Sequence, residues 1–316
     1  MRPIHLAMLV ALSVIWGSAF ALVKVALDDL EPLTLVAGRL TTAAVFLSIA
    51  LLLVSRRWLP RTRDAWTAFV LLGVVNNVFP FVLLTWGQQH IESSLAAILT
   101  ASMPLSTVLL AHYWIRERLT FDRAAGVLVG FAGVFLLIGG DLRDITESST
   151  LGQLAIVVGV LGYSFGTVFA RRYLPTADPA QTAAGQMLVG AIVTVPLALA
   201  VDRPFDVSVS LKTALAWGAL GIVASGVAYL LFFNLIRHVT ATQASMTAYL
   251  IPVTALFVGA VFLDERLAAN SLIGLALIIA GVWVVNGGGL WLAARARRPP
   301  RRVEPARGAA GDDPRR

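Results

Sequence analysis

The sequence contains no cysteine, and charged residues account for only 14% of its 316 positions. Without cysteine, the chain has no disulfide bond, thiolate metal site or cysteine nucleophile. Soluble domains carry about 25% charged residues, so a chain with so few is not expected to present an ordinary polar surface to water. Its four histidines are scattered without metal-ligand spacing, and we expect neither a metal ion nor another cofactor.

Hydrophobic residues, by contrast, make up 58% of the chain. Ten apolar runs are each long enough to cross about 30 Å of hydrocarbon as a helix. They lie near residues 6–27, 33–54, 66–87, 93–115, 122–140, 151–170, 180–201, 213–235, 242–263 and 268–291. The sequence therefore predicts an all-α integral membrane protein with ten transmembrane helices. Asp28 and Asp29 follow the first run in place of a cleavage site, so we interpret that run as a retained helix.

Basic residues are unevenly divided between the loops, and short cytoplasmic loops are the ones that accumulate lysine and arginine. If the amino terminus is inside, the inside loops hold eleven basic residues and the outside loops hold four. A further eight arginines follow Gly289, in a proline-containing tail (292–316) typical of a disordered basic cytoplasmic segment near anionic lipid. We expect a multi-pass protein of the cell (inner) membrane with both termini in the cytoplasm. Its partners would be lipid and a small solute, not nucleic acid.

The sequence repeats itself after 148 residues, where His90–Gly140 aligns with His238–Gly288 without a gap. Chance apolar similarity would match leucine and valine, whereas these matches include proline, glycine and a charged pair. They include Pro104 with Pro252, Glu117 with Glu265, Arg118 with Arg266, Gly133 with Gly281 and, at a shift of 147, Lys24 with Arg171 and Trp16 with Tyr163. We interpret residues 1–140 and 151–291 as two five-helix repeats. Because five is odd, the repeats are inverted, and such halves enclose a central cavity in secondary transporters.

The same residues carry a resemblance to a known family. Trp16-Gly17-Ser18 with Lys24 lies in the first run, Arg39 lies in the second, and each half has a mid-helix proline, a terminal glutamate and a glycine-rich helix. This pattern resembles the EamA branch of the drug/metabolite transporter superfamily over residues 6–291. The resemblance implies a basket of helices around a central cavity and export of amino acids or related metabolites. Tyr163-Ser164 replaces Trp-Gly in the second half, so equal contributions of the two halves are not expected.

Lys24 and Arg39 are the only basic residues clearly inside the apolar runs and not at their ends, where a central charge costs about 2.5–3.5 kcal/mol on insertion scales. One interpretation is snorkelling of both side chains toward acidic residues 28, 29 and 31. The other is that Arg39 faces the interior as a fixed positive charge near an outer gate or a substrate carboxylate. Both interpretations remain open at this stage.

Other polar and aromatic residues lie at mid-depth. Asn76 and Asn77 precede Pro80, which frees backbone carbonyls, although such residues also act as glue between helices. The remaining candidates for binding solute are Trp16, Ser102, Tyr163, Ser225, Tyr229 and Tyr249. Glu117 and Glu265 end their runs and are expected to pair with arginine or cap backbone, with gating as the alternative. No carboxylate lies at the centre of a run, which disfavours proton coupling through one.

These features predict a secondary transporter that exports small metabolites, such as amino acids, across the inner or plasma membrane. A channel or a non-transporting membrane scaffold is the alternative. An enzyme is not expected, because the runs contain no Ser-His pair, paired carboxylates or metal-ligand cluster. A channel is disfavoured, because a ring-like filter usually comes from oligomeric symmetry and this chain closes its own pseudo-symmetry. The protein is expected to be monomeric. The sequence does not name the solute.

Overall fold

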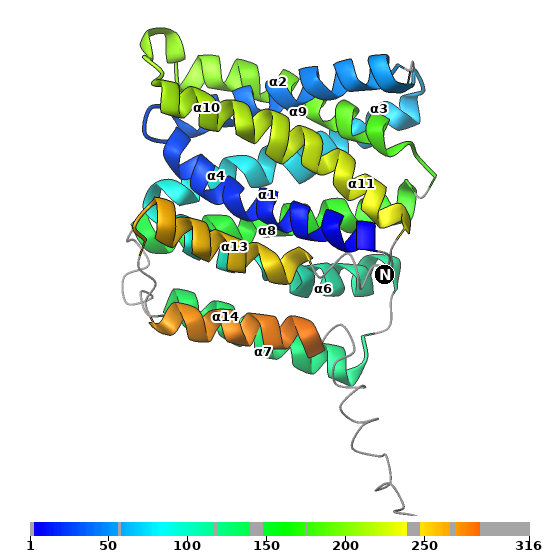
Figure 1. The fold of residues 1–316 in the computed structure, drawn as a ribbon. Coiled ribbons are helices and arrows are strands. Elements are labelled where there is room, and N and C mark those ends of the chain that lie inside the picture. Colours follow the sequence, from blue (N-terminus) through cyan, green and yellow to red (C-terminus); the bar gives the residue numbers. More distant parts are fainter. Residues whose placement is uncertain are drawn as a thin grey trace, which may run out of the picture.

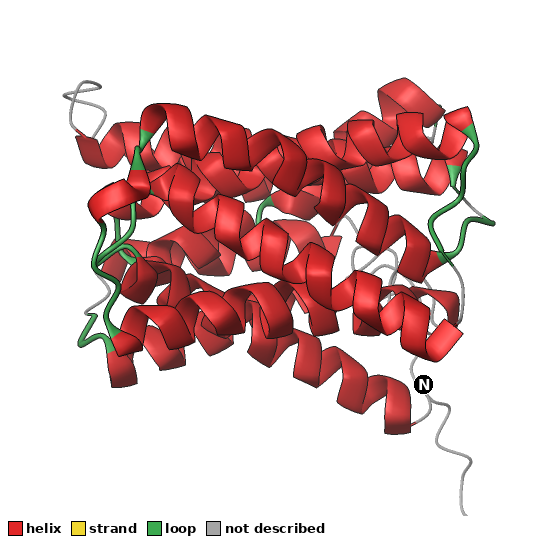
Figure 2. Ribbon diagram, turned by 90° about the horizontal axis from the view of Figure 1, so that it is seen from above, coloured by secondary structure: helices red, strands yellow, loops and turns green. Residues whose placement is uncertain are grey.

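The computed structural model describes residues 3–55, 58–116, 119–139, 148–174, 176–238, 247–265 and 269–284. Within these residues all regular structure is helical (Figures 1 and 2). The elements are α1 (Pro3–Ala26), α2 (Pro32–Ala50), η1 (Leu51–Ser55), α3 (Arg63–Leu71), η2 (Leu72–Val78), α4 (Phe79–His90), α5 (Ser93–Thr100), α6 (Met103–Ile115), α7 (Phe121–Gly139), α8 (Ser148–Tyr173), α9 (Pro179–Val201), η3 (Pro204–Asp206), α10 (Leu211–Ala219), η4 (Leu220–Val227), α11 (Ala228–His238), α13 (Thr247–Phe262) and α14 (Ala269–Trp283).

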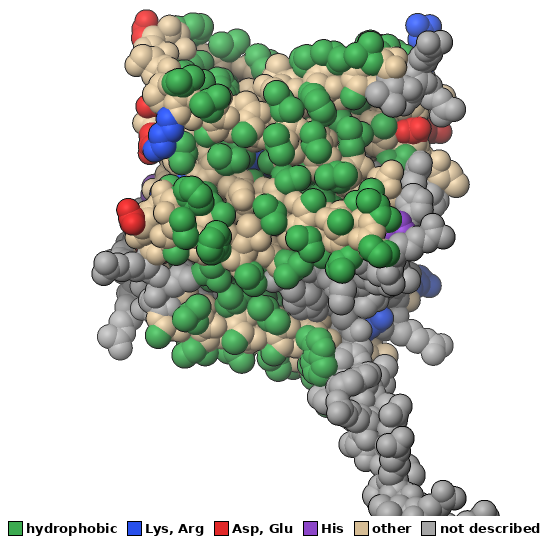
Figure 3. Space-filling view, in the orientation of Figure 1, with side chains coloured by type: hydrophobic (Ala, Val, Ile, Leu, Met, Phe, Trp, Pro, Cys, Tyr) green, Lys and Arg blue, Asp and Glu red, His purple; other side chains and the backbone are tan. Residues whose placement is uncertain are grey.

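Seven of the described segments are long and apolar enough to cross a membrane. They are Pro3–Ala26, Pro32–Leu53, Arg63–His90, Ser93–Trp114, Ser149–Tyr173, Pro179–Val201 and Leu211–Phe232, with shorter apolar helices at Leu250–Phe262 and Ser271–Trp283. On the face shown in Figure 3, hydrophobic side chains cover the middle, and charged side chains gather at the two ends. The predicted all-helical, multi-pass membrane fold is therefore confirmed, whereas the ten-helix arrangement in two repeats stays a prediction.

The helices lie side by side, from α2 and α9 at one edge of the molecule to α7 and α14 at the other (Figure 1). α2 packs against α9, α4 against α8, α1 against α13, and α7 against α14. The last pair is in close contact because glycines face each other: a Cβ added at Gly281 would lie 2.5 Å from the backbone carbonyl oxygen of Gly126. Small residues at helix crossings permit such close approach inside a membrane.

η1 is a π-helical turn that follows α2. Two further π-helical stretches, η2 and η4, lie within long helical segments and begin 148 residues apart. In the first, Pro80 lies in the opening turn of α4 and has no N–H to donate to the carbonyl of Asn76. The polar break predicted around Asn76 and Asn77 is therefore a π-helical widening of a continuous helix, a feature that often marks functional sites. η4 contains no proline, and its glycines lie against α2: Gly221 contacts Thr42.

The run at residues 93–115, predicted as one helix, is instead two helices. α5 ends at Thr100, and α6 begins at Met103 with Pro104 in its first turn. The proline ring clashes with the carbonyl four residues earlier and lacks the N–H that would bond to it. In the second half, Pro252 lies inside the continuous helix α13, so proline at equivalent positions has different effects in the two halves.

Candidate functional site

Arg39 of α2 is buried, with only 9% of its surface exposed. Its Nε donates a hydrogen bond to the hydroxyl of Ser225 on η4 over 2.8 Å, and its guanidinium carbon lies 4.0 Å from the centre of the Phe81 ring. Tyr163 and Tyr229 are close enough to interact electrostatically with the guanidinium group. Among the residues that the structure describes, no carboxylate contacts Arg39. Arg39 therefore does not snorkel toward the acidic residues that follow the first helix.

Asn77 of η2 is fully buried. Its Oδ1 accepts hydrogen bonds from the Tyr229 hydroxyl at 3.2 Å and from the Asn76 amide at 3.4 Å, and Asn76 also reaches Oε1 of Gln186 on α9 at 3.4 Å. The Nδ2 group of Asn77 has no partner. A buried donor without a partner costs about 1–3 kcal/mol, which makes this amide a prime candidate to bind a solute.

Two aromatic pairs flank these polar groups. Trp16 of α1 meets Tyr229 of α11 edge to face, with ring centres 6.4 Å apart, and Tyr163 of α8 meets Phe81 of α4 in the same way at 6.2 Å. The indole N–H of Trp16 donates to the carbonyl of Ala224 in η4 at 3.2 Å. The partner that a buried indole requires is therefore supplied by the π-helical stretch.

These contacts are related by the spacing of the sequence repeat. A shift of 147 residues takes Trp16 to Tyr163 and Arg39 to Gln186, and a shift of 148 takes Asn77 to Ser225 and Phe81 to Tyr229. The Trp16–Tyr229 pair thus corresponds to Tyr163–Phe81, and the bond between α2 and η4 corresponds to the bond between α9 and η2. The cluster is symmetric in position but asymmetric in charge, because one member carries a guanidinium where its mate carries an amide.

The structure brings seven of the nine predicted site residues into this cluster: Trp16, Arg39, Asn76, Asn77, Tyr163, Ser225 and Tyr229. Ser102 lies in the turn between α5 and α6, where its hydroxyl donates to the carbonyl of Leu99 at 2.6 Å. The side chain of Tyr249, on α13, lies outside the described residues. Sequence reasoning did not single out Gln186 and Phe81, although the repeat shifts connect them to Arg39 and Tyr229.

A second set of polar contacts lies where α4 ends and α5 begins. The ammonium group of Lys24 donates to the carbonyls of Gln88 (2.7 Å) and Ile91 (3.0 Å), and so caps the carboxyl end of α4 instead of pairing with the acidic residues beyond its own helix. The carboxylate of Glu265 accepts from the backbone N–H groups of Ser93 (2.7 Å) and Ser94 (3.0 Å). A carboxylate there satisfies free N–H groups and the positive end of the helix dipole.

Glu265 follows α13, so this cap joins the second half of the chain to the first. The backbone-capping role expected for Glu265 is thus seen in the structure, and its repeat mate Glu117 lies outside the described residues. Glu92 immediately precedes α5 and is exposed. Desolvation, then the nearby negative charge of Glu265, raises the pKa of Glu92, and Lys24 opposes this shift.

Comparison with known proteins is consistent with this geometry. The chain is 32% identical over 296 residues to a "Probable terminal-alkyne amino-acid exporter" of Streptantibioticus cattleyicolor (93% of this chain, 97% of that one) and 28% identical over 284 residues to the "Uncharacterized inner membrane transporter YedA" of Escherichia coli K12 (89% and 90%). A crystal structure with 22% identity superposes with a TM-score of 0.65 over 94% of this chain and all of the other, which shows a shared fold. The model of the EamA-like transporter family matches residues 3–139 and again 150–287. The chain therefore belongs to the EamA-like transporter family.

Proposed function

We propose that this protein is a secondary transporter that exports small carboxylate-bearing metabolites, amino acids or related compounds, across the cell (inner) membrane. The observation that carries the proposal is Arg39, a buried cation held by Ser225 and Phe81. A guanidinium group has five N–H donors in a planar fork that matches a carboxylate. Only one of these donors is engaged within the described residues, so the others are available to a solute.

Energetics favour an anionic partner at this place. A charge at the centre of a membrane helix costs about 2.5–3.5 kcal/mol on insertion scales, and a hydroxyl and an aromatic face offset only part of that. A solute carboxylate neutralises the guanidinium and removes much of the remaining penalty. Binding therefore favours the conformations in which the site is closed around the solute, which is the differential affinity that a carrier needs.

The rest of the cluster offers a further donor for an acceptor oxygen of the solute and aromatic surface for its side chain or ammonium group. The Nδ2 group of Asn77 is a buried donor without a partner, and its Oδ1 already accepts from Tyr229. Phe81, Tyr163 and Trp16 supply ring faces and edges for an apolar side chain or a cation. Export of an amino acid is also what the name of the Streptantibioticus relative states, which supports both the solute class and the direction proposed here.

We place this site between two inverted five-helix repeats, residues 1–140 and 151–291, in a monomer with ten transmembrane helices and both termini in the cytoplasm. The double match of the family model supports the repeats, as do the paired contacts of the cluster. Single cysteines test the topology cleanly because the chain has none of its own. We expect cysteines that replace Arg61 and Thr176 to be labelled from the cytoplasm and one that replaces Asp206 to be labelled from outside. Labelling at positions 176 and 206 from the same side would contradict the proposed topology.

Counterflow in proteoliposomes tests the proposed function. Vesicles preloaded with one amino acid are diluted into its labelled form, over a panel of amino acids and of cationic drugs that lack a carboxylate. We expect saturable uptake of at least one carboxylate-bearing solute and none in protein-free vesicles. Flux that rises linearly with concentration would indicate a channel, and absence of flux across the panel would favour a scaffold; either result contradicts the proposal.

A further inference from the structure

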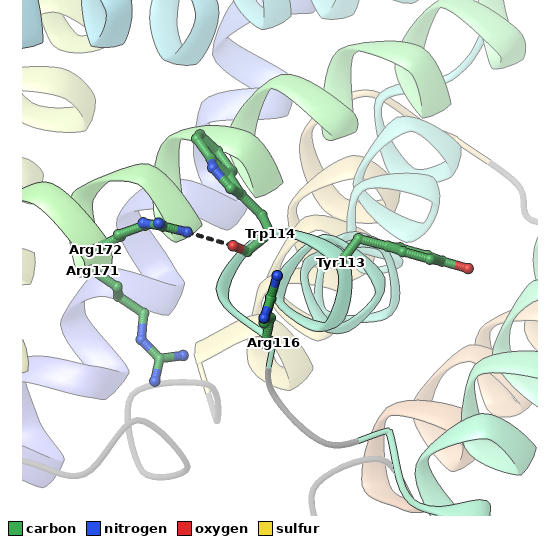
Figure 4. A pocket seen from close by; sticks show the side chains of 5 residues that line it. All are labelled: Tyr113, Trp114, Arg116, Arg171 and Arg172. Atoms are coloured by element: carbon green, nitrogen blue, oxygen red, sulfur yellow. Dashed lines mark hydrogen bonds between the residues drawn. The ribbon is translucent and has the colours of Figure 1, made fainter.

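A pocket of about 740 Å³ lies at the carboxyl ends of α6 and α8, away from the cluster around Arg39. Of the residues that the structure describes, five line it: Tyr113, Trp114, Arg116, Arg171 and Arg172. Figure 4 shows the three arginines on one side of the end of α6, with Tyr113 directed away from them. Along α8, Arg172 lies nine residues beyond Tyr163, or roughly 14 Å at the rise of an α-helix. The pocket is therefore a separate feature from the candidate solute site.

The wall of the pocket is held in place by two kinds of contact. Arg172 donates a hydrogen bond to the carbonyl of Trp114 and lies over the ring of Tyr173, with 5.2 Å from its guanidinium carbon to the ring centre. The indole of Trp114 packs against Phe165 at 4.7 Å and Phe169 at 6.3 Å between ring centres. Arg172 thus acts as a brace between α6 and α8, and the aromatic rings pack the two helices together beside the pocket.

Among the residues that the structure describes, the lining carries positive charge and no carboxylate. Arg116 is the residue that ends α6, and its backbone is left-handed (φ 55°, ψ 32°), a conformation that costs about 1–2 kcal/mol for a residue other than glycine. This turn brings the side chain of Arg116 to the pocket instead of continuing the helix. Guanidinium groups that line one pocket can recognise phosphate, through paired N–H donors and charge.

We propose that this pocket binds the phosphate headgroup of an anionic phospholipid from the adjacent leaflet. The depth fits, because both spans end here: the membrane-spanning segments reach Trp114 and Tyr173. The surroundings fit as well, since Tyr113 is 80% and Tyr173 51% exposed, and exposed aromatic rings at a span end mark the headgroup level. Basic pockets between transmembrane helices are a known way to hold anionic lipid on the cytoplasmic side.

Native mass spectrometry of the full chain, with bound lipid counted, tests the proposal. Phosphatidylglycerol and phosphatidylcholine are compared on the wild type and on a variant carrying Arg116→Gln and Arg171→Gln. Arg172 is left intact because it braces the helices. Each cation near an anionic headgroup strengthens binding by about fivefold. The two substitutions together should therefore lower the affinity for phosphatidylglycerol by about 25-fold. Phosphatidylcholine should bind more weakly than phosphatidylglycerol to the wild type and should change little in the variant.

A matched control removes two exposed arginines at the same end of the molecule but outside the pocket: Arg61→Gln, two residues before α3, with Arg63→Gln, the first residue of α3. It should retain the wild-type affinity for phosphatidylglycerol. A third variant, Arg116→Lys with Arg171→Lys, keeps the charge and should recover part of the binding, which separates loss of the ligand from loss of the fold.

Three results would overturn the proposal. If the affinity for phosphatidylglycerol falls as much in the control as in the pocket variant, general surface charge accounts for binding. If the two lipids bind the wild type equally, no anionic headgroup is recognised. If inorganic phosphate at millimolar concentration displaces phosphatidylglycerol, the pocket is a site for a free anion and not for lipid.

Discussion

The guanidinium group of Arg39 donates to the hydroxyl of Ser225 over 2.8 Å, although 186 residues separate them in the sequence. One residue lies on α2 and the other on the π-helical stretch η4, so the bond crosses from the first half of the chain to the second. The corresponding contact between η2 and α9 joins Gln186, the repeat mate of Arg39, to Asn76 and carries no charge. Asn76 is the neighbour of Asn77, the repeat mate of Ser225. A solute that binds here through a single carboxylate meets a cation from only one half of the chain. This asymmetry orients the solute in the site.

Ser225→Ala tests the support of the guanidinium group. The substitution removes the acceptor of Nε, so Arg39 becomes less well positioned and more costly to bury. Hydrogen bonds to charged groups contribute about 1.5–3 kcal/mol, and we expect KM for a carboxylate solute in counterflow to rise by about tenfold or more. Ser102→Ala is the matched control, because that hydroxyl bonds only within its own turn. Equal impairment of the two variants would mean that the cluster has been misassigned.

Tyr229→Phe tests the link between Asn77 and the second half. Loss of the hydroxyl leaves Oδ1 of the buried Asn77 amide with only the longer bond from Asn76, so the amide can reorient and no longer presents Nδ2 in a fixed direction. We expect a loss of about 1–2 kcal/mol in solute binding, or roughly fivefold to thirtyfold in KM, with normal yield and membrane insertion. Tyr113→Phe, at an exposed ring far from the cluster, should transport like the wild type. Unchanged kinetics in Tyr229→Phe would rule out this role.

Glu265→Gln tests the contact between the halves at the start of α5. The neutral side chain loses the charge-assisted bonds to Ser93 and Ser94, and removal of a helix cap costs about 1 kcal/mol. We expect a lower apparent Tm in detergent, measured by size-exclusion chromatography with fluorescence detection after heating. Asp206→Asn, at an exposed acid in η3, is the control and should leave Tm unchanged. The account fails here if Glu265→Gln is as stable as the wild type.

Glu92 and Asp29 should give pH dependences of opposite sign. Because the pKa of Glu92 is raised from its usual 4.5 in the folded state, folding binds a proton there, and stability falls as pH rises through the raised pKa. Glu92→Gln removes that loss, so its Tm relative to the wild type should increase with pH in this window. Hydrogen bonds from Ser210 lower the pKa of Asp29 from 3.8, so its contribution is present at neutral pH and is lost as pH falls through the lowered pKa.

Asp29→Asn should therefore be less stable than the wild type at neutral pH and should approach it in strong acid. Thermal melts of the three proteins between pH 3 and 8 measure both effects. If Tm depends on pH in the same way for Glu92→Gln and the wild type, the pKa of Glu92 is not raised. If Glu92→Gln instead loses stability relative to the wild type as pH rises, as Asp29→Asn does, the pKa of Glu92 is shifted in the opposite direction.

Much of the fold could be predicted because membrane helices must be long, apolar and internally hydrogen-bonded. The limits of the long spans and the packing role of the glycines follow from that constraint. The break at Ala101 and Ser102 could not be predicted from Pro104 alone, because Pro252 occupies the equivalent place inside a continuous helix. Tertiary contacts decide whether a proline bends a membrane helix or divides it.

The candidate site was predictable where burial of a polar group within the membrane demands a partner, as for Arg39 and Asn77. The sequence did not reveal which residue each polar side chain would bond to. Lys24 bonds to carbonyls of α4, and Ser225 bonds to Arg39, and both choices depend on how distant helices pack. Gln186 was overlooked because a lone glutamine in a helix carries no signal, and only the shift of 147 residues from Arg39 connects it to the site.

The most direct test of the central claim compares counterflow of one transported amino acid with that of its carboxamide, in the wild type and in Arg39→Gln. If Arg39 binds the carboxylate, the wild type should prefer the acid by about 10- to 100-fold in apparent affinity, the range of a charged hydrogen bond, and Arg39→Gln should lose that preference while remaining folded. An Arg39→Gln protein that transports the acid with unchanged affinity and unchanged preference over the carboxamide would contradict the account.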